Sequence, residues 1–205
     1  MAVKLYILRH GLPLFPDSVK RYIARTDLPL SPEGIAQAEQ TAFRLANTGI
    51  GVVYTSPLRR CRDFAEIIVD KLGLPTVIAI PELMEINMGS WEYRSIQEIK
   101  NTCPDEYTAR GLNMAGFTPE GGESFLRCQI RAVKAITAIA AKGRDSRMPE
   151  VCIVTHAGLI RSFLCYAEDH DLNDLFYYKI PYGGIFTVNY EDGRFKPALS
   201  LAPAP

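Results

Sequence analysis

Two apolar segments, each closing with a histidine and a glycine, constrain the fold of this chain more than any other feature. Residues 3–11 read VKLYILRHG, and residues 151–158 read VCIVTHAG. Short runs rich in Val, Ile, Leu and Tyr are typical of buried strands. In open α/β sheets the ligand crevice lies at the carboxyl ends of the strands. The pattern therefore predicts an α/β fold with His10 and His156 at strand ends.

Length and charge narrow the class of protein. The chain has 205 residues, with 23 basic and 23 acidic side chains, so no basic field is available to hold nucleic acid or an anionic membrane. We expect a single domain over residues 1–200 and a disordered tail over 201–205. No apolar run approaches the roughly 20 residues that span a bilayer, and no signal-peptide pattern follows Met1. A cytoplasmic protein is expected.

The five cysteines form no C-x-x-C pair, and their number is odd. This usage favours reduced, packed thiols over a disulfide framework.

Helix starts follow the predicted strands. Ser31-Pro32-Glu33 combines an N-cap, a proline at the first helical position and an acid, which predicts a helix to about Asn47. Ser56-Pro57 predicts the start of a second helix with the same N-cap and proline arrangement, and Gly73 is predicted to be the C-cap of that helix. The residues of the first helix expected to face the core are Ile35, Ala38, Ala42 and Leu45.

The remaining elements are read in the same way. Strands are predicted over 49–55 and 75–80, and a helix with a polar connection over 95–118. A helix reaching Lys142 is expected to bury Phe125, Ile130, Val133, Ile136 and Ile139. A further helix over 159–168 is followed by a hairpin, with strands over 182–190 and 195–199 around Asp192-Gly193.

Several charged residues are candidates for a binding site. Arg59 and Arg60 lie in the first turn of a helix, where the positive end of the helix dipole disfavours cations unless an anion is bound. A salt-bridged surface face is the alternative for Arg59. In the loop after His10, Arg21 and Arg25 are either available to an anionic substrate or are solvated surface charges. Glu82 and Glu85, near Gly89 and the only tryptophan, are candidate general acids.

Histidines and arginines at strand ends and helix starts indicate a phosphate pocket. Arginine binds phosphate with two parallel hydrogen bonds, and a neutral imidazole nitrogen can attack phosphorus. A zinc site is the rival interpretation. Zinc needs three or four converging ligands, and neither strand-end histidine has a partner at the usual short spacing. We therefore expect no metal and no cofactor.

The chain resembles the histidine phosphatase superfamily, which has the phosphoglycerate mutase-like fold, over nearly its whole length. Six segments carry the resemblance: LRHG at 8–11, DLPLSPEGIAQA at 27–38, SPLRRC at 56–61, ELMEINMGSWE at 82–92, GGES at 121–124 and VTHAGLIR at 154–161. The resemblance implies a three-layer α/β/α sandwich with a mostly parallel central sheet.

The resemblance also implies roles for individual residues. His10 would be the nucleophile and form a phosphohistidine, while Arg9, Arg60 and His156 hold the phosphoryl oxygens. Glu85 would protonate the leaving group and then, as a carboxylate, activate water. Further residues implied to contact the substrate are Arg21, Arg25, Glu123, Ser124, Ala157 and Gly158.

Two departures from the family pattern concern the site. The segment 12–18 lacks the asparagine that many members use to hold phosphate, and Arg21 or Arg25 is a candidate substitute. The glycine that usually follows Trp-Glu is Tyr93, which affects the loop of the predicted acid.

The resemblance implies a metal-independent phosphomonoesterase acting on a small-molecule phosphate ester. The segments over 27–31 and 85–89 are most similar to alpha-ribazole 5′-phosphate phosphatases. Phosphoglycerate mutase-type transfer is an alternative, although the short stretch between Trp91 and Gly122 favours hydrolysis. A non-catalytic module that binds a phosphorylated ligand on the same fold is the second alternative. No nucleic-acid or membrane partner is expected, and a homodimer stays open.

Overall fold

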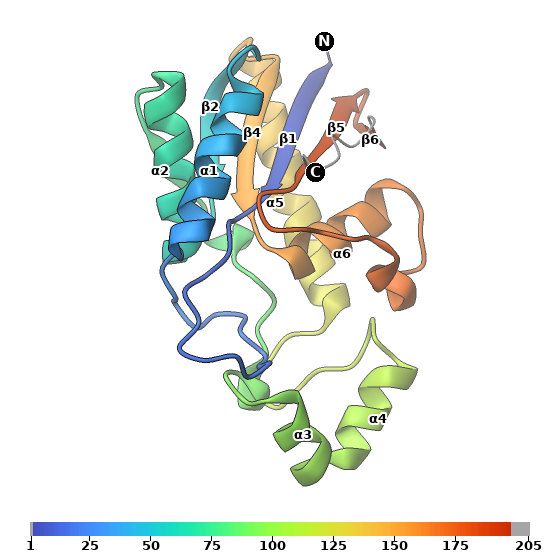
Figure 1. The fold of residues 1–205 in the computed structure, drawn as a ribbon. Coiled ribbons are helices and arrows are strands. Elements are labelled where there is room, and N and C mark those ends of the chain that lie inside the picture. Colours follow the sequence, from blue (N-terminus) through green and yellow to red (C-terminus); the bar gives the residue numbers. More distant parts are fainter. Residues whose placement is uncertain (1, 198–205) are drawn as a thin grey trace.

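A central β-sheet organises the computed structural model, which describes residues 2–197 (Figure 1). Its strand order is β3-β2-β4-β1-β5-β6. The strands are β1 (Val3–Arg9), β2 (Ile50–Thr55), β3 (Val77–Ala79), β4 (Glu150–Thr155), β5 (Ile185–Glu191) and β6 (Arg194–Pro197). The first four in spatial order are parallel, whereas β5 pairs with β1, and β6 with β5, in the antiparallel sense. The predicted mostly parallel sheet is confirmed.

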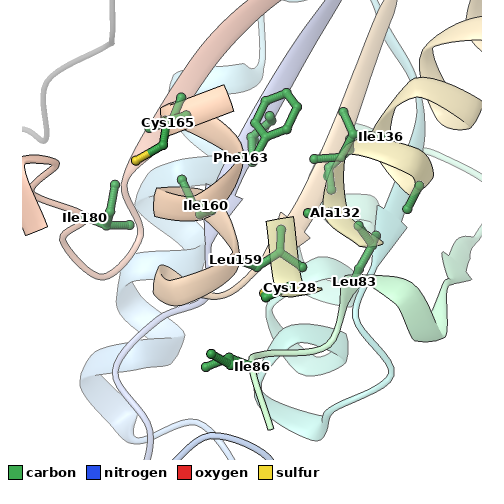
Figure 2. Packing of buried hydrophobic residues seen from close by; sticks show 14 of the residues in the cluster. Leu83, Ile86, Cys128, Ala132, Ile136, Leu159, Ile160, Phe163, Cys165 and Ile180 are labelled. Carbon is green, nitrogen blue, oxygen red and sulfur yellow. The ribbon is translucent and has the colours of Figure 1, made fainter. Parts of the chain in front are cut away.

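Helices cover both faces of the sheet, which confirms the three-layer α/β/α arrangement. Helices α1 (Pro32–Leu45) and α2 (Arg59–Leu72) enclose one hydrophobic cluster with the side chains of Tyr6, Leu8 and Val154. On the opposite face, α5 (Phe125–Asp145) and α6 (Ala157–Ala167) pack over Leu5, Ile7 and Ile153. Figure 2 shows Ala132 and Ile136 of α5 beside Leu159 and Phe163 of α6.

Beyond the sheet, α3 (Ile96–Thr102) and α4 (Pro104–Leu112) form a small helical pair at one end of the molecule (Figure 1). Three short 3-10 helices complete the described elements: η1 (Pro81–Leu83), η2 (Gly89–Trp91) and η3 (Leu172–Tyr177). Within residues 2–197, no helix is long and apolar enough to cross a membrane.

The predicted helix starts were right for α1 and wrong for α2. The Ser31 side chain caps α1 by accepting from the Gly34 N–H at 3.0 Å. Helix α2 begins only at Arg59, and its N-cap residue, Leu58, makes no side-chain cap. Ser56 lies outside this helix; its hydroxyl accepts from the Leu58 N–H at 3.3 Å and contacts the His156 ring at 2.8 Å. Gly73 ends α2 with φ +67°, as expected of a glycine C-cap.

Two of the expected core residues are exposed. Ile35 is 45% and Ile130 61% accessible to solvent, whereas the other residues predicted for these helix faces are buried or half-buried. The buried stripe of α1 follows Gly34, Ala38, Thr41, Ala42 and Leu45, and Ile35 lies just beyond its edge, about 100° around the helix axis from Gly34 and about 20° from Ala42. Ile130 lies outside the buried stripe of α5 for the same reason.

The remaining predictions concern turns and cysteines. Asp192 and Gly193 both have positive φ, +52° and +76°, as the tight turn between β5 and β6 requires. All five cysteines are free thiols, and four of them are buried. Part of the second hairpin strand, 198–199, and the predicted tail, 201–205, lie outside the described residues.

A glycine contact joins the end of β1 to the start of α1. A Cβ atom on Gly11 would lie 2.4 Å from the Gly34 carbonyl oxygen, and one on Gly34 would lie 2.2 Å from the Leu12 carbonyl oxygen. Real Cβ atoms do not approach backbone this closely. Gly11 and Gly34 therefore let helix α1 pack directly against the segment that carries His10.

Replacing Gly34 with alanine should lower the free energy of unfolding by about 1–3 kcal/mol, because the backbone must move to admit the methyl group. The control is Gly111→Ala, at an exposed position of α4 where an added Cβ meets nothing within 4 Å. That change should instead raise stability by about 0.5–1 kcal/mol, because alanine favours helix. Urea denaturation measures both, and equal effects of the two changes would contradict the packing argument.

Candidate active site

Three neighbouring parallel strands bring the candidate residues together at one edge of the sheet. β4 lies between β2 and β1, and Thr155 is in register with Arg9. The residues that follow these strands, Ser56, His156 and His10, therefore emerge side by side. The rings of His10 and His156 are 5.1 Å apart between centroids. The two histidines, far apart in sequence, lie together as the strand pattern predicted.

His10 is held as a neutral imidazole. Its Nδ1 lies 2.7 Å from the Gly11 carbonyl oxygen, and because a carbonyl only accepts, Nδ1 carries the proton. Burial, with the charges of Arg60 and Arg9, lowers the pKa of His10 well below its ordinary value. Its Nε2 consequently carries a lone pair and no proton. This is the protonation state that an attacking nitrogen needs.

Arg60 links the two histidines. It is buried, and its Nε donates to His10 Nε2 at 3.2 Å, while its Nη2 lies 3.2 Å from His156 Nδ1. The carbonyl oxygens of Ala24 and Thr26 accept the remaining hydrogen bonds. Neighbouring Arg59 points elsewhere, to an exposed ion pair with Asp63 at 3.4 Å. The choice of Arg60 over Arg59, implied by the family pattern, agrees with this geometry.

His156 is also neutral and has a fixed tautomer. Its Nδ1 accepts from Arg60, so the proton resides on Nε2, which lies 2.8 Å from the Ser56 hydroxyl oxygen. Burial lowers the pKa of His156, and the charge of Arg60 lowers it further. Cys61 Sγ lies 3.4 Å from His156 Nε2. Burial raises the pKa of this thiol, so Cys61 stays protonated.

Arg9 supplies the second guanidinium group of the site. Its Nη1 donates to the Ile180 carbonyl oxygen at 2.6 Å, and its guanidinium carbon lies 3.6 Å from the centre of the Tyr182 ring. The same tyrosine ring is 5.8 Å from that of His10. Within residues 2–197, Nε of Arg9 is buried without a hydrogen-bond partner.

Glu85 lies at the amino end of α6. Its Oε2 accepts from the Gly158 N–H at 2.9 Å, and its Oε1 accepts from the N–H groups of Leu159 and Ile86 at 3.0 and 2.9 Å. The helix terminus favours a negative charge at this point. The Glu85 charge raises the pKa of Arg9, although burial dominates and lowers it. The acid is thus electrostatically coupled to Arg9.

The other residues implied to contact substrate are mostly engaged with protein groups. Arg21 forms an ion pair with Asp17, and Arg25 donates to the Glu85 carbonyl at 3.3 Å. Glu123 binds the guanidinium of Arg131 through both oxygens, and Ser124 caps α5. The Gly158 N–H is directed at Glu85 and not into open space; Ala157 begins the same helix. Their contact with substrate stays a prediction.

Three residues that build the site were not predicted from the sequence. The pattern around Ser56 indicates a helix cap, although its position at the end of a strand was a signal for the site. Glu92 is the last residue of the segment 82–92, which carries part of the family resemblance, and its Oε1 accepts four hydrogen bonds from residues 24–26. Tyr182 follows an irregular segment, and no local pattern distinguishes it.

The assembled groups suit a phosphate dianion. The unprotonated Nε2 of a neutral His10 lies against the Arg60 guanidinium, and the positive charge of Arg9 also acts on this ring. Among residues 2–197, no group of three or more His, Cys, Asp or Glu side chains is arranged to hold a metal ion.

Comparisons with known proteins agree with this chemistry. A metal-independent phosphoserine phosphatase of Arabidopsis thaliana is 34% identical over 131 residues, which are 63% of this chain and 54% of that protein. A probable phosphoglycerate mutase, GpmB of Yersinia pestis, is 38% identical over 97 residues, 47% of this chain and 44% of that protein. The matches thus span about half the length of these curated relatives.

A solved structure shows the same fold. The alpha-ribazole phosphatase from Shigella flexneri superposes with a TM-score of 0.85 at 21% identity, covering 98% of this chain and 96% of that one. A family model described as the histidine phosphatase superfamily (branch 1) matches residues 5–200. With this match over nearly the whole sequence, the chain belongs to the histidine phosphatase superfamily.

Proposed function

We propose that this protein hydrolyses a small-molecule phosphomonoester, without a metal, through a phosphohistidine on His10. The observation that carries the proposal is the neutral His10 ring, with its Nε2 lone pair beside the Arg60 guanidinium and the His156 ring. A phosphate dianion bound by Arg60 and Arg9 would bring phosphorus to that lone pair.

The reaction has two balanced steps. His10 Nε2 attacks phosphorus, the bond from phosphorus to the ester oxygen breaks, and Glu85 in its acid form gives a proton to the leaving oxygen. Water then attacks the phosphohistidine, Glu85 takes a proton from it, and His10 leaves as neutral imidazole. Oε2 of Glu85 accepts a single backbone hydrogen bond, so it retains a lone pair for the proton.

A hollow of about 310 Å³ is a candidate for the leaving group. Its lining combines apolar and aromatic residues with polar and charged ones: Phe15, Asp17, Ser18, Val19, Lys20, Arg21 and Tyr182. Tyr182 also contacts Arg9. Such a lining would suit an ester whose body has both an aromatic part and polar groups, and alpha-ribazole 5′-phosphate is a candidate because the similar Shigella flexneri structure is an alpha-ribazole phosphatase. A larger hollow, about 560 Å³ between β3 and α5, carries none of the site histidines.

A mutase and a non-catalytic module remain the alternatives, and one substrate panel separates all three. The panel contains p-nitrophenyl phosphate, alpha-ribazole phosphate, phosphoserine and 3-phosphoglycerate, each with EDTA. Release of inorganic phosphate supports the proposal. Isomerisation of 3-phosphoglycerate without release would support a mutase, and binding without turnover would support a non-catalytic module.

We further propose a cytoplasmic location, because all five cysteines are free thiols.

Removing the nucleophile should abolish turnover. His10→Asn is expected to lower kcat for p-nitrophenyl phosphate by about 10⁴-fold or more, because asparagine cannot accept the phosphoryl group. The control is His170→Asn, which changes a histidine paired with Asp174 on η3 and leaves the site intact. Steady-state kinetics measure both, and full activity of the His10 variant would refute the mechanism.

The role of Glu85 predicts an effect that depends on the leaving group. Glu85→Gln should lower kcat about 10²- to 10⁴-fold for an alkyl ester such as phosphoserine, whose leaving oxygen needs a proton. The loss should be smaller for p-nitrophenyl phosphate, whose leaving phenolate is stable. Exposed Glu82→Gln is the matched control. Equal losses for both esters would argue against proton donation by Glu85.

The neutral histidines link stability to pH. The pKa values of His10 and His156 are lowered below the ordinary 6.5, so below about pH 6.5 the unfolded chain binds protons that the folded chain excludes. The free energy of unfolding should therefore fall on acidification, by up to about 1.4 kcal/mol per pH unit for each histidine. Urea titrations at several pH values should show a shallower slope for His10→Asn than for the unchanged protein; an equal slope would mean that His10 is not held neutral.

A further inference from the structure

Glu92 binds a loop that the proposed reaction does not otherwise explain. It directly follows η2, and its Oε1 accepts from the N–H groups of Ala24, Arg25 and Thr26 at 2.9, 3.1 and 3.0 Å. The Thr26 hydroxyl donates to the same oxygen at 2.7 Å. Three successive N–H groups directed at one anion form a concave anion-binding arrangement of backbone.

The opposite side of this loop faces Arg60. The Thr26 carbonyl accepts from Arg60 Nη1 at 2.8 Å, and the Ala24 carbonyl accepts from Nη2. In a trans peptide the N–H and C=O bonds point in opposite directions. The peptide unit between Ala24 and Arg25 therefore donates to Glu92 on one side and accepts from Arg60 on the other. A single peptide plane connects the two side chains.

Neighbouring contacts also hold the loop in place. Tyr22 and Tyr93 are joined by a backbone hydrogen bond of 2.7 Å, and Asp27 accepts from the Arg59 N–H at 2.6 Å. The Leu28 N–H donates to the Thr26 carbonyl at 3.1 Å, and the Arg25 side chain donates to the Glu85 carbonyl. The N–H groups of residues 24–26, however, are all directed at Glu92, so this carboxylate orients the peptide units on the side away from Arg60.

The charge of Glu92 strengthens this connection. Arg60 is buried, and its recorded hydrogen-bond partners are two carbonyls and two imidazoles, all uncharged. A carboxylate that accepts from a peptide N–H polarises that peptide and makes its carbonyl a better acceptor. Glu92 thus stabilises the Arg60 guanidinium through the intervening peptide.

We infer that Glu92 is a positioning residue for phosphoryl transfer: it orients loop 24–26, whose carbonyls hold the Arg60 guanidinium against His10 and His156. The inference rests on the proposed function for its kinetic consequence. The structural part of the inference, that Glu92 positions the Arg60 guanidinium, can also be tested by measuring anion binding alone.

The test compares Glu92→Gln with Glu106→Gln. Glu106 accepts one hydrogen bond, from the indole N–H of Trp91 at 3.1 Å, so it contacts the residue next to Glu92 and none of the hydrogen bonds of loop 24–26 involves it. In each variant the side-chain amide keeps the shape of the carboxylate but removes its charge. Both variants are assayed for kcat and KM with p-nitrophenyl phosphate and for inhibition by orthovanadate. Thermal unfolding is recorded in parallel, together with calorimetric titration of inorganic phosphate.

We expect Glu92→Gln to lower kcat/KM about 10- to 100-fold, the range found when groups that orient a reactive ligand are removed. The inhibition constant of orthovanadate and the dissociation constant of phosphate should rise in parallel, because all three depend on Arg60. Glu106→Gln should lower the unfolding temperature while leaving these constants within about twofold of the unchanged protein.

A double-mutant cycle separates orientation of Arg60 from general loss of stability. In an Arg60→Lys background, which keeps the charge but lacks the planar guanidinium, Glu92→Gln should have little further effect. Independent, multiplicative effects would overturn the inference, as would phosphate and vanadate constants equal to those of Glu106→Gln. If Glu92→Gln does not fold, Thr26→Val, which removes one of the four donors, should weaken phosphate binding in the same direction; unchanged binding would overturn the inference.

Failure of the proposed function gives a different result. A protein without turnover on any ester would refute the phosphatase proposal, whereas phosphate binding that weakens in the Glu92 variant would still support the inference. Turnover by the unchanged protein, with phosphate affinity unchanged in the Glu92 variant, would support the phosphatase proposal and overturn the inference about Glu92.

Discussion

Arg60 is almost completely withdrawn from water, and its guanidinium contacts two imidazole rings and two backbone carbonyls. A buried charge is costly unless an opposite charge or hydrogen bonds compensate it. Here the hydrogen bonds are supplied, but by uncharged groups. The site therefore retains a positive potential that a phosphate dianion would neutralise. Burial lowers the pKa of both histidines, and the charge of Arg60 lowers it further.

Strand pairing explains how this guanidinium meets its partners. His10, Ser56 and His156 each follow a strand, and β2, β4 and β1 are neighbours in the sheet. The glycine contact between Gly11 and Gly34 lets α1 approach the turn after β1. Arg60 reaches the rings from the first turn of α2. The geometry of the site is thus a consequence of parallel order at one sheet edge.

The features of the site that follow from local pattern could be predicted. An apolar run that ends in His-Gly indicates a strand end, and the two histidines were expected there. The fold class followed from the order of the elements and from the family resemblance. Helix faces were harder, because Ile35 and Ile130 differ from their buried neighbours only by their angle around the helix axis.

The residues that sequence reasoning missed act through tertiary contacts. The partner of Ser56 is a ring one hundred positions away, and Glu92 binds backbone N–H groups of another loop. The sequence does not indicate which backbone N–H groups a distant side chain will contact. Tyr93, where the family pattern has glycine, has a φ of +64°, a left-handed backbone conformation that glycine adopts without a steric penalty.

The position of β1 in the sheet also bears on how the chain is made. Its two strand partners, β4 and β5, both lie in the last third of the sequence. During translation the apolar segment 3–8 therefore emerges long before any strand that can pair with it. Such late, non-local pairing slows folding and leaves hydrophobic segments open to aggregation. Segment 3–8 therefore has no strand partner until β4 and β5 have been synthesised.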